Sequence, residues 1–461
     1  MQSKKRINSL KGQGPFDMDM QKVVEEAKRI NERYNLFVTI NENPRKGFPV
    51  AIKDNICTKG LRTTAGSKII HNYVPVFDAT VVKRIKKNGG AIIGKTSMDE
   101  FGFGGFSVNV GVDFKTPKNP WDTKRCCGGS SGGSGGYVAI SEYPRFVLGQ
   151  STGGSISAPA NFCGVVGITP TYGLVSRYGL IDYGNSLDKI GTMARTVKDA
   201  TYGLSIIAGH DPNDFTTLKQ KSQDYTKFCK PGKMKIGVPK EYFGEVIDEK
   251  VKKCVWKAIK TLESLGFEYS ECSLPHTKWG IAAYYILALS EASTNLAKFC
   301  GIRYGLSSNP EDKGFNEYFS EIRANGFGAE AKRRVLLGTF TRMAGYRDAF
   351  YLKALKVRTL IIQDYKKVFK KFDVLASSVM PTIAPTFNEL ESMTPLEHYM
   401  ADILTNPPNL AGIPHASVPC GFVQGMPVGL HILADHLQEG KLIQTAFTFE
   451  KQRGEIKYPR L

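Results

Sequence analysis

Apolar residues along the first hundred positions show two patterns in alternation, helical spacing and short continuous runs. Together these patterns predict helices separated by short buried strands. Residues 18–34 and 79–87 repeat apolar side chains every three or four positions, as an amphipathic helix does. Residues 37–40, 49–52 and 91–94 are short apolar runs bounded by polar or glycine residues, as buried strands are. This alternation predicts an α/β fold in which a mixed central β-sheet is sandwiched between helices.

The pattern changes in the second half of the chain, where helices dominate. Residues 248–370 are mainly helical in character, and the apolar run 281–289 is interpreted as a buried helix because Glu291 cuts it short of a membrane span. Further strands and a closing helix are predicted at 235–238, 374–376, 416–419, 428–432 and 438–451. No repeat or low-complexity linker marks a boundary, so we predict one large domain over residues 1–461.

Residues 113–165 differ in composition from the rest of the chain. They are rich in glycine and serine, as flexible loops are, but the apolar run 146–148 interrupts them. A low-complexity linker would lack such a run. We therefore predict that this segment is a loop system wrapped around a functional site.

The chain is strongly basic, with a formal net charge of +19 over 461 residues and a pI near 9.4. Clustered Lys and Arg side chains neutralise phosphates, so the charge is consistent with a nucleic acid nearby. A solvated basic surface explains it equally well. The basic residues are spread along the chain, and no aromatic-interleaved basic block occurs. The charge alone leaves both interpretations open.

Targeting and metal-binding patterns change the picture little. The first residues, MQSKKRINSLKGQGPF, include basic side chains but no apolar segment, which argues against secretion. We expect a cytoplasmic protein, with the mitochondrial matrix as the less favoured alternative. The nine cysteines are scattered and form no C-x-x-C pair, so neither a disulfide framework nor a zinc site is expected.

Two glycine-flanked serines mark the segment 113–165. Ser130 lies in GGSSGGS, and Ser155 ends the later motif QSTGGS. Glycine pairs permit close approach of a substrate and leave backbone N–H groups free to face an oxyanion. A serine hydroxyl also needs a base before it can attack. The seven histidines occur in no recognisable catalytic context, and the G-x-S-x-G elbow is absent.

Lys53 is the candidate base. Burial can lower the pKa of a lysine until the neutral amine accepts a proton near pH 7. Lys53 ends the apolar run in GFPVAIKDN. A lysine at a strand end is more commonly a solvated surface residue, so the pattern by itself does not decide the role of Lys53.

Three motifs in order, GFPVAIKDNI, GGSSGGSGG and STGGSISAPANFCGVVGITPTYG, resemble the amidase signature family. The resemblance implies a Ser–cis-Ser–Lys triad made of Lys53, Ser130 and Ser155. It also implies that Ser155 attacks a carboxamide carbon while Ser130 relays its proton to Lys53. Ser131 would support the loop, or would be the relay in place of Ser130. The implied oxyanion hole is formed by backbone N–H groups of residues 152–155, including Thr152, Gly153 and Gly154.

Within that family the chain is most similar to the glutaminase subunits, the A subunits, of aspartyl/glutamyl-tRNA amidotransferases. The similarity rests on GKTSMDEF, NPWD, SLDKIG, KRRVLLGTF and DILTNPPNLAGIPHASVPCG, among other segments. It implies that Arg334 binds the carboxylate of glutamine, that Asp402 binds its ammonium and that Tyr284 adds a hydroxyl. Arg333 is the adjacent alternative to Arg334. Without the resemblance, Arg334 and Asp402 would be interpreted as surface ion-pair members.

The resemblance also implies partners and a division of the chain. Residues 47–200 would form the catalytic core, between the N-terminal helix and the helical substrate-side region 248–370. A B subunit that binds aminoacyl-tRNA and a small C-type subunit would complete the complex. ATP and Mg²⁺ are expected in the partner subunit, because G-x-x-x-x-G-K-[ST] is missing from this chain. No cofactor and no metal are expected in this chain.

Two departures from the family pattern lie beside the predicted nucleophile. Ser151 and Ser157 stand where the family usually has Asp and Arg. Loss of both is consistent with replacement of a mutually paired couple. The segment 104–111 also departs from the family's Ser/Thr-rich version.

The alternatives to a glutaminase subunit are a stand-alone amidase for small amides and an inactive scaffold protein of the complex. A glycine-serine-rich RNA-binding module is the weakest alternative.

Overall fold

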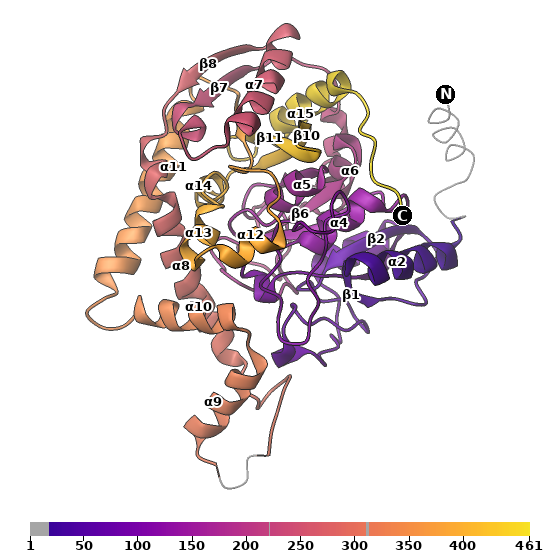
Figure 1. The fold of residues 1–461 in the computed structure, drawn as a ribbon, viewed down its shortest axis with the longest axis vertical. Coiled ribbons are helices and arrows are strands. Elements are labelled where there is room, and N and C mark those ends of the chain that lie inside the picture. Colours follow the sequence, from indigo (N-terminus) through magenta and orange to yellow (C-terminus); the bar gives the residue numbers. More distant parts are fainter. Residues whose placement is uncertain (1–17, 221, 310–312) are drawn as a thin grey trace.

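One β-sheet of eleven strands forms the centre of the molecule (Figure 1). The structure is a computed structural model that describes residues 18–220, 222–309 and 313–461. The strands are β1 (Phe37–Ile40), β2 (Phe48–Lys53), β3 (Gly90–Thr96), β4 (Val147–Ser151), β5 (Val166–Thr169), β6 (Lys189–Ala194), β7 (Lys235–Pro239), β8 (Glu268–Cys272), β9 (Val374–Ser378), β10 (His415–Val423) and β11 (Met426–Ala434). They lie side by side in the order β1-β3-β2-β4-β6-β5-β10-β11-β9-β7-β8.

Helices cover this sheet, as the predicted α/β sandwich requires. The helices of the described residues are α2 (Met20–Tyr34), α3 (Thr80–Lys87), α4 (Gly132–Ile140), α5 (Ser157–Cys163), α6 (Val197–Ile207), α7 (Glu249–Ser264), α8 (Gly280–Asn295), α9 (Phe315–Gly326), α10 (Ala329–Phe340), α11 (Lys353–Val368), α12 (Phe387–Ser392), α13 (Pro395–Met400), α14 (Asn406–Ala411) and α15 (Glu439–Arg453), of which α4, α5, α6, α7 and α15 pack against strands of the sheet. Helices α8, α10 and α11 pack together, and α9 lies at the lower end of the view in Figure 1. Among the described residues, no helix is long and apolar enough to span a membrane.

Three parallel strands bring the predicted catalytic segments to one edge of the sheet. Strand β2 pairs in parallel with β3, and its Ile52 pairs in parallel with Leu148 of β4. Parallel strands end at the same edge, where α/β proteins commonly place their sites. Lys53 is the last residue of β2, and Ser151 is the last residue of β4. The turn that carries Ser155 follows directly from β4.

Glycines on neighbouring strands let α5, the helix after Ser155, lie close to the sheet. A Cβ on Gly191 of β6 would stand 2.9 Å from Ile156 Cδ1, and one on Gly167 of β5 would stand 2.7 Å from Ala160 Cβ. Such contacts are too short for a close-packed interior. Larger residues at these positions would push α5, and with it the Ser155 turn, away from the sheet.

The predicted elements outside residues 113–165 are confirmed, and each begins within two residues of the observed one. The segment 37–40 matches β1, and 374–376 begins with β9. The largest differences at an end are the run 281–289, because α8 continues to Asn295, and the segment 416–419, because β10 continues to Val423. The predicted mixed sheet between helices is confirmed, and it is continuous through the described residues.

The loop prediction for residues 113–165 is wrong in part, because α4, β4 and all of α5 lie within it, with β4 at the apolar run 146–148. Helix α4 has the sequence GGSGGYVAI, and glycine is a poor helix former, so local propensity gave no helix signal. All nine of its residues are buried, so packing overrides propensity. Strands β5, β6 and β8 were not predicted either, because each is short and none shows clear alternation.

Candidate active site

Lys53 is fully buried at the carboxyl end of β2. All six residues of that strand are buried, so the lysine emerges from the interior of the sheet. Lys53 Nζ lies 2.7 Å from Ser130 Oγ, 2.9 Å from the main-chain oxygen of Gln150 and 3.1 Å from Gln150 Oε1. The side chain of Lys53 is 0% exposed. Lys53 is therefore not a solvated surface lysine.

Burial sets the charge state of Lys53. Removal from water disfavours the ammonium and lowers the pKa of Lys53 to about 7. The negative charges of Asp99 and Asp188 oppose this effect in part. A large fraction of the amine is therefore neutral near pH 7 and can accept a proton.

Ser130 and Ser131 have different partners, although they are adjacent. The peptide bond between Gly129 and Ser130 is cis, as the resemblance implies. Ser130 Oγ contacts Lys53, whereas Ser131 Oγ donates to the main-chain oxygen of Gln150 at 3.1 Å. The backbone N–H of Ser131 donates to the carbonyl of Ser155 at 3.3 Å. Of the two candidate relays, Ser130 is the one beside the lysine, and Ser131 links the two glycine-rich segments.

Ser155 lies on the turn between β4 and α5, and 7% of it is exposed. Its hydroxyl forms no hydrogen bond with any described residue. Gly154, a predicted oxyanion donor, instead directs its N–H to Ser151 Oγ at 3.1 Å. The N–H groups of Thr152, Gly153 and Ser155 have no acceptor within the described part of the chain. The turn therefore presents donors next to the serine, but Gly154 is already engaged.

Two side chains lie directly over Gly153. A Cβ on this glycine would stand 2.5 Å from both Tyr284 Oη and Asn406 Oδ1, so only glycine fits. Tyr284 was predicted from the resemblance; Asn406, at the start of α14, was not. Both amide atoms of Asn406 are buried and lack a partner within the described residues. An unpaired buried polar group costs about 1–3 kcal/mol, so this amide is available to a polar substrate atom.

Arg334 is buried on α10 and does not lie at the surface. Its Nε donates to Glu330 Oε1 at 2.7 Å, and its Nη1 donates to Tyr183 Oη at 2.5 Å. The remaining nitrogen, Nη2, has no hydrogen-bond partner within the described residues. Arg333, the predicted alternative, pairs with Glu330 from a partly exposed position. Four aromatic rings surround the Arg334 guanidinium, those of Phe103, Tyr183, Tyr285 and Tyr399.

Asp402 is also buried, close to Gly105 in the segment 104–111. It accepts a hydrogen bond from Tyr285 Oη at 3.2 Å, and a Cβ on Gly105 would stand 3.1 Å from its Oδ1. Burial raises the pKa of Asp402 to about 7, while the Tyr285 hydrogen bond and Arg334 act in the opposite direction. The surface ion-pair interpretation of Arg334 and Asp402 is therefore wrong.

Sequence reasoning assigned no role to Asp99 and Asp188, the two carboxylates whose charges act on Lys53. Asp99 follows β3 and accepts the N–H groups of Ser107 and Asn109 at 3.0 and 2.8 Å. Burial raises the pKa of Asp99 to about 6 and that of Asp188 to about 7. Both residues occur in quoted motifs, MDEF and SLDKIG, but the motifs alone did not place them beside the lysine.

The two serines that depart from the family pattern are fully buried and face different groups. Ser151 accepts the N–H of Gly154, whereas Ser157 Oγ lies 3.1 Å from His415 Nδ1. No hydrogen bond joins Ser151 to Ser157. His415 Nδ1 lies 3.0 Å from His431 Nε2, and burial together with Lys189 lowers the pKa of both histidines. Groups that can carry positive charge therefore gather near Ser157.

This arrangement predicts unequal effects of restoring the two charges. Ser157→Arg adds a cation near Lys189 and two histidines, and an uncompensated buried charge costs about 3–5 kcal/mol. Ser151→Asp is expected to cost less, because Lys189 lies directly opposite in the β4–β6 ladder and faces the same side. Urea denaturation measures the loss in the free energy of unfolding for Ser157→Arg and for Ser151→Asp. Equal losses, or a larger loss for Ser151→Asp, would contradict this.

The double substitution tests the paired-couple hypothesis. If Asp and Arg at these positions stabilise each other, Ser151→Asp/Ser157→Arg should unfold at a higher urea concentration than either single variant. The double-mutant cycle should then give a coupling free energy of about 0.5–3 kcal/mol. Strict additivity of the two losses would refute the hypothesis.

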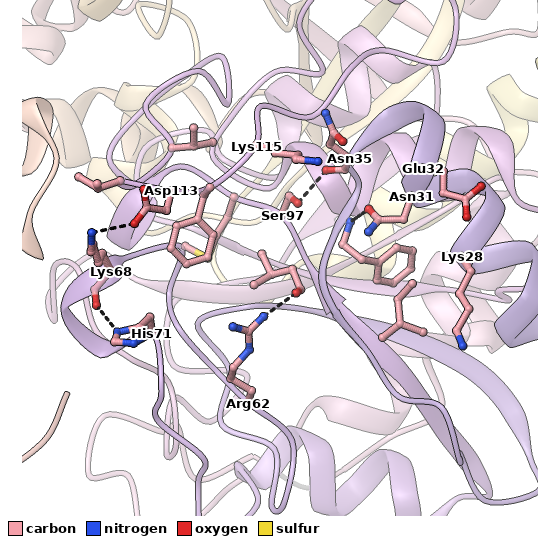
Figure 2. Close-up of a pocket in the computed structure, with 17 residues that line it drawn as sticks. Lys28, Asn31, Glu32, Asn35, Arg62, Lys68, His71, Ser97, Asp113 and Lys115 are labelled. Atoms are coloured by element: carbon pink, nitrogen blue, oxygen red, sulfur yellow. Dashed lines mark hydrogen bonds and ion pairs between the residues drawn. The ribbon is translucent and has the colours of Figure 1, made fainter. Parts of the chain in front are cut away.

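A separate groove with a cavity volume of about 690 Å³ lies beside α2 and β1 (Figure 2). Residues of α2, β1 and the segment 110–115 line it, together with Arg62, Lys68 and Ser97. Lys68 Nζ pairs with Asp113 Oδ2 at 2.7 Å in the lining of the groove. None of the predicted site residues lines it, so this hollow is distinct from the buried residues around Ser155.

Comparison with known proteins shows the family to which the chain is related. The family model described as Amidase matches residues 3–443. The chain is 48% identical to the A subunit of glutamyl-tRNA(Gln) amidotransferase of Heliobacterium modesticaldum, over 95% of this chain and 89% of that protein. The protein of the same name from Halothermothrix orenii is 48% identical, over 94% and 90%. The crystal structure of the corresponding A subunit from Thermotoga maritima superimposes with a TM-score of 0.81 at 38% identity, covering 95% of this chain and 94% of that one.

Proposed function

The chain belongs to the amidase family, and we propose that it is the glutamine-hydrolysing subunit of a tRNA-dependent amidotransferase. Its relatives with the name of such a subunit are nearly half identical over almost their full lengths. The buried contact between Lys53 and Ser130, next to the turn that carries Ser155, is the observation that supports an active enzyme. It also argues against the inactive-scaffold alternative.

The reaction begins when Ser155 Oγ attacks the side-chain carboxamide carbon of glutamine. Ser130 takes the proton of Ser155 and passes its own to neutral Lys53, so a C–O bond forms and negative charge moves to the carbonyl oxygen. The N–H groups of Gly153 and Ser155 stabilise this oxyanion. The C–N bond then breaks, and the proton held by Lys53 returns through Ser130 to the leaving nitrogen, which departs as ammonia. Water hydrolyses the acyl ester and releases glutamate.

Recognition of glutamine requires one cation and one anion at fixed positions. Arg334 is held by Glu330 and Tyr183, which leaves Nη2 for the α-carboxylate. Asp402 binds the α-ammonium, and the approach of that cation favours the ionised carboxylate. Tyr284 and Asn406 lie over Gly153 and orient the carboxamide group.

The ammonia is consumed on a partner subunit. We assign the activation of Glu-tRNA(Gln) or Asp-tRNA(Asn) by ATP and Mg²⁺ to a B subunit, and assembly to a small C-type subunit. The net charge of +19 helps the complex assemble around tRNA, so association should weaken as salt rises. No cofactor is assigned to this chain, and the reaction is placed in the cytoplasm.

One experiment tests this proposal. The purified chain is assayed for glutamine hydrolysis alone, and then with B and C-type subunits, charged tRNA and ATP. Glutamine-dependent amidation of tRNA that requires the partners is the expected result. Brisk hydrolysis of simple amides without partners, and no turnover of glutamine under any condition, would make the chain a stand-alone amidase.

The rate of glutamine hydrolysis should rise with pH around neutrality. Lys53 must be neutral to accept the proton, and its pKa lies at about 7. The rate is therefore expected to be low at pH 5.5 and to increase with a midpoint of about 7. A pH profile of kcat at saturating glutamine measures the midpoint. A midpoint above pH 9 would show that Lys53 titrates like a solvated lysine, and would contradict the account.

A further inference from the structure

The side chain of Gln150 uses all of its hydrogen-bonding capacity within the site. Its Oε1 accepts from Lys53 Nζ at 3.1 Å and from Asn55 Nδ2 at 3.1 Å. Its Nε2 donates to Thr152 Oγ1 at 2.8 Å and to Asp188 Oδ1 at 3.0 Å. A primary amide offers two acceptor positions and two donors, so none is left over. A flipped amide would set its N–H groups against the N–H donors of Lys53 and Asn55, so one orientation is fixed.

The two oxygens of Gln150 match the neutral form of Lys53. A neutral amine has two N–H donors and one lone pair, and the main-chain oxygen and Oε1 of Gln150 lie 2.9 and 3.1 Å from Nζ. If both donors point at these oxygens, the lone pair points at the third neighbour, Ser130 Oγ, 2.7 Å away. Ser130 then donates its proton to Lys53, as the proposed relay requires.

We propose that Gln150 is a positioning residue that aims the lone pair of neutral Lys53 at Ser130 and links the base to the turn carrying the nucleophile. The link runs from Gln150 Nε2 to Thr152, which begins that turn, and to Asp188, which receives the Thr152 hydroxyl at 2.6 Å. Asp188 is itself held by the N–H groups of Tyr183 and Gly184 at 2.9 and 3.0 Å. This inference rests on the proposed amidase chemistry of Lys53, and it assigns Gln150 no contact with substrate.

Two substitutions of Gln150 separate the effect of its Oε1 acceptor on the orientation of Lys53 from the effect of the charge at this position on the pKa of Lys53. Gln150→Met keeps the size of the side chain but removes the Oε1 acceptor, so Lys53 loses the contact that fixes its rotation. Gln150→Glu keeps an acceptor beside Lys53 but adds a negative charge, which favours the ammonium. It also places a second carboxylate against Asp188. The first change should lower the rate, and the second should move its pH dependence.

The test measures the rate at which a fluorophosphonate labels Ser155 between pH 5 and pH 10. This reaction needs the base and the nucleophile but neither glutamine nor tRNA. Gln150→Glu is expected to raise the midpoint by about 1 to 3 pH units, the usual effect of an adjacent opposite charge. Gln150→Met is expected to lower the plateau rate at least about tenfold, within the range for a misdirected general base. In the assembled complex, kcat for glutamine should fall while KM changes little.

Gln223→Glu is the matched control. Gln223 is an exposed glutamine whose Oε1 also accepts from a lysine, Lys227 Nζ, at 2.8 Å, so the same chemical change occurs far from the site. It should leave both midpoint and plateau at wild-type values. Thermal denaturation shows whether each variant is folded. Gln150→Asn, which withdraws the amide by one methylene, replaces either variant that does not fold, and it should also lower the plateau rate.

The outcomes are distinct. A folded Gln150→Glu enzyme with the wild-type midpoint, or a folded Gln150→Met or Gln150→Asn enzyme with the wild-type plateau, would overturn the proposal. A lower plateau explained by lower thermal stability alone, with no shift in Gln150→Glu, would also overturn it. Failure of the proposed function looks different, because glutamine turnover would then be absent while labelling of Ser155 kept its dependence on Gln150.

Discussion

Replacing Ser155 by alanine is expected to abolish glutamine hydrolysis without disturbing the fold. The hydroxyl forms no hydrogen bond with any described residue, so its removal breaks no structural contact. Loss of a catalytic serine nucleophile lowers kcat by about 10⁴-fold or more, because the remaining groups act as a unit with it. The melting temperature of Ser155→Ala should match that of the wild type. Ammonia release measured in the assembled complex gives the activity.

Ser131→Ala is the matched control for this result. Ser131 is a buried serine in the same loop system, and its hydroxyl donates to the main-chain oxygen of Gln150. Its loss should leave substantial activity, whereas Ser130→Ala should remove the relay and nearly all activity. An active Ser155→Ala enzyme would contradict the assigned nucleophile. If Ser131→Ala were inactive and Ser130→Ala active, the relay assignment would have to be exchanged.

Lys53→Met should lose activity but not stability. The substitution removes the only group assigned as the base, and general-base catalysis contributes about 10²–10⁴-fold. Burial of the amine disfavours its charged form, so an apolar side chain of similar length removes a cost to folding. The free energy of unfolding, from urea denaturation near pH 7, should therefore equal or exceed the wild-type value.

Lys95→Met, unlike Lys53→Met, should lower the free energy of unfolding. Lys95 is also fully buried, one strand away on β3, and lies 3.9 Å from Asp54, with a hydrogen bond to Thr63 Oγ1 at 2.8 Å. Its loss would leave Asp54 buried without its cation, at a cost of about 3–5 kcal/mol. If Lys53→Met were strongly destabilised and Lys95→Met were not, Lys53 would be the structural cation and its assignment as the neutral base would be wrong.

The fold is largely predictable because the hydrophobic pattern of most elements is contained within the segment that forms the element. The segments that became β1, β2 and α15 carry their own patterns, and packing only adjusted their ends. Helix α4 could not be predicted, because its glycines disfavour a helix in isolation and are tolerated through burial against the sheet. The information for α4 therefore lies in tertiary contacts that no local window contains.

The site was predictable only where motifs mark it. Lys53, Ser130 and Ser155 were identified by ordered motifs, and the structure places Lys53 against Ser130. Gln150 lies 97 positions from Lys53, and it reaches the lysine only because β2 and β4 are parallel neighbours. Asn406 is not predictable from the sequence for a similar reason, because its position over Gly153 depends on where α14 packs. Such contacts follow from strand order and helix packing, which the residue pattern alone does not specify.

The most direct test of the account is to identify the acyl-enzyme. The assembled complex is mixed with glutamine, quenched in acid within the first turnover, and digested for peptide mass spectrometry. We expect a γ-glutamyl ester on Ser155, absent from Ser155→Ala and from samples without glutamine. Ammonia release at the wild-type rate with the glutamyl group on another residue would contradict it, and so would ammonia release at that rate with no covalent adduct.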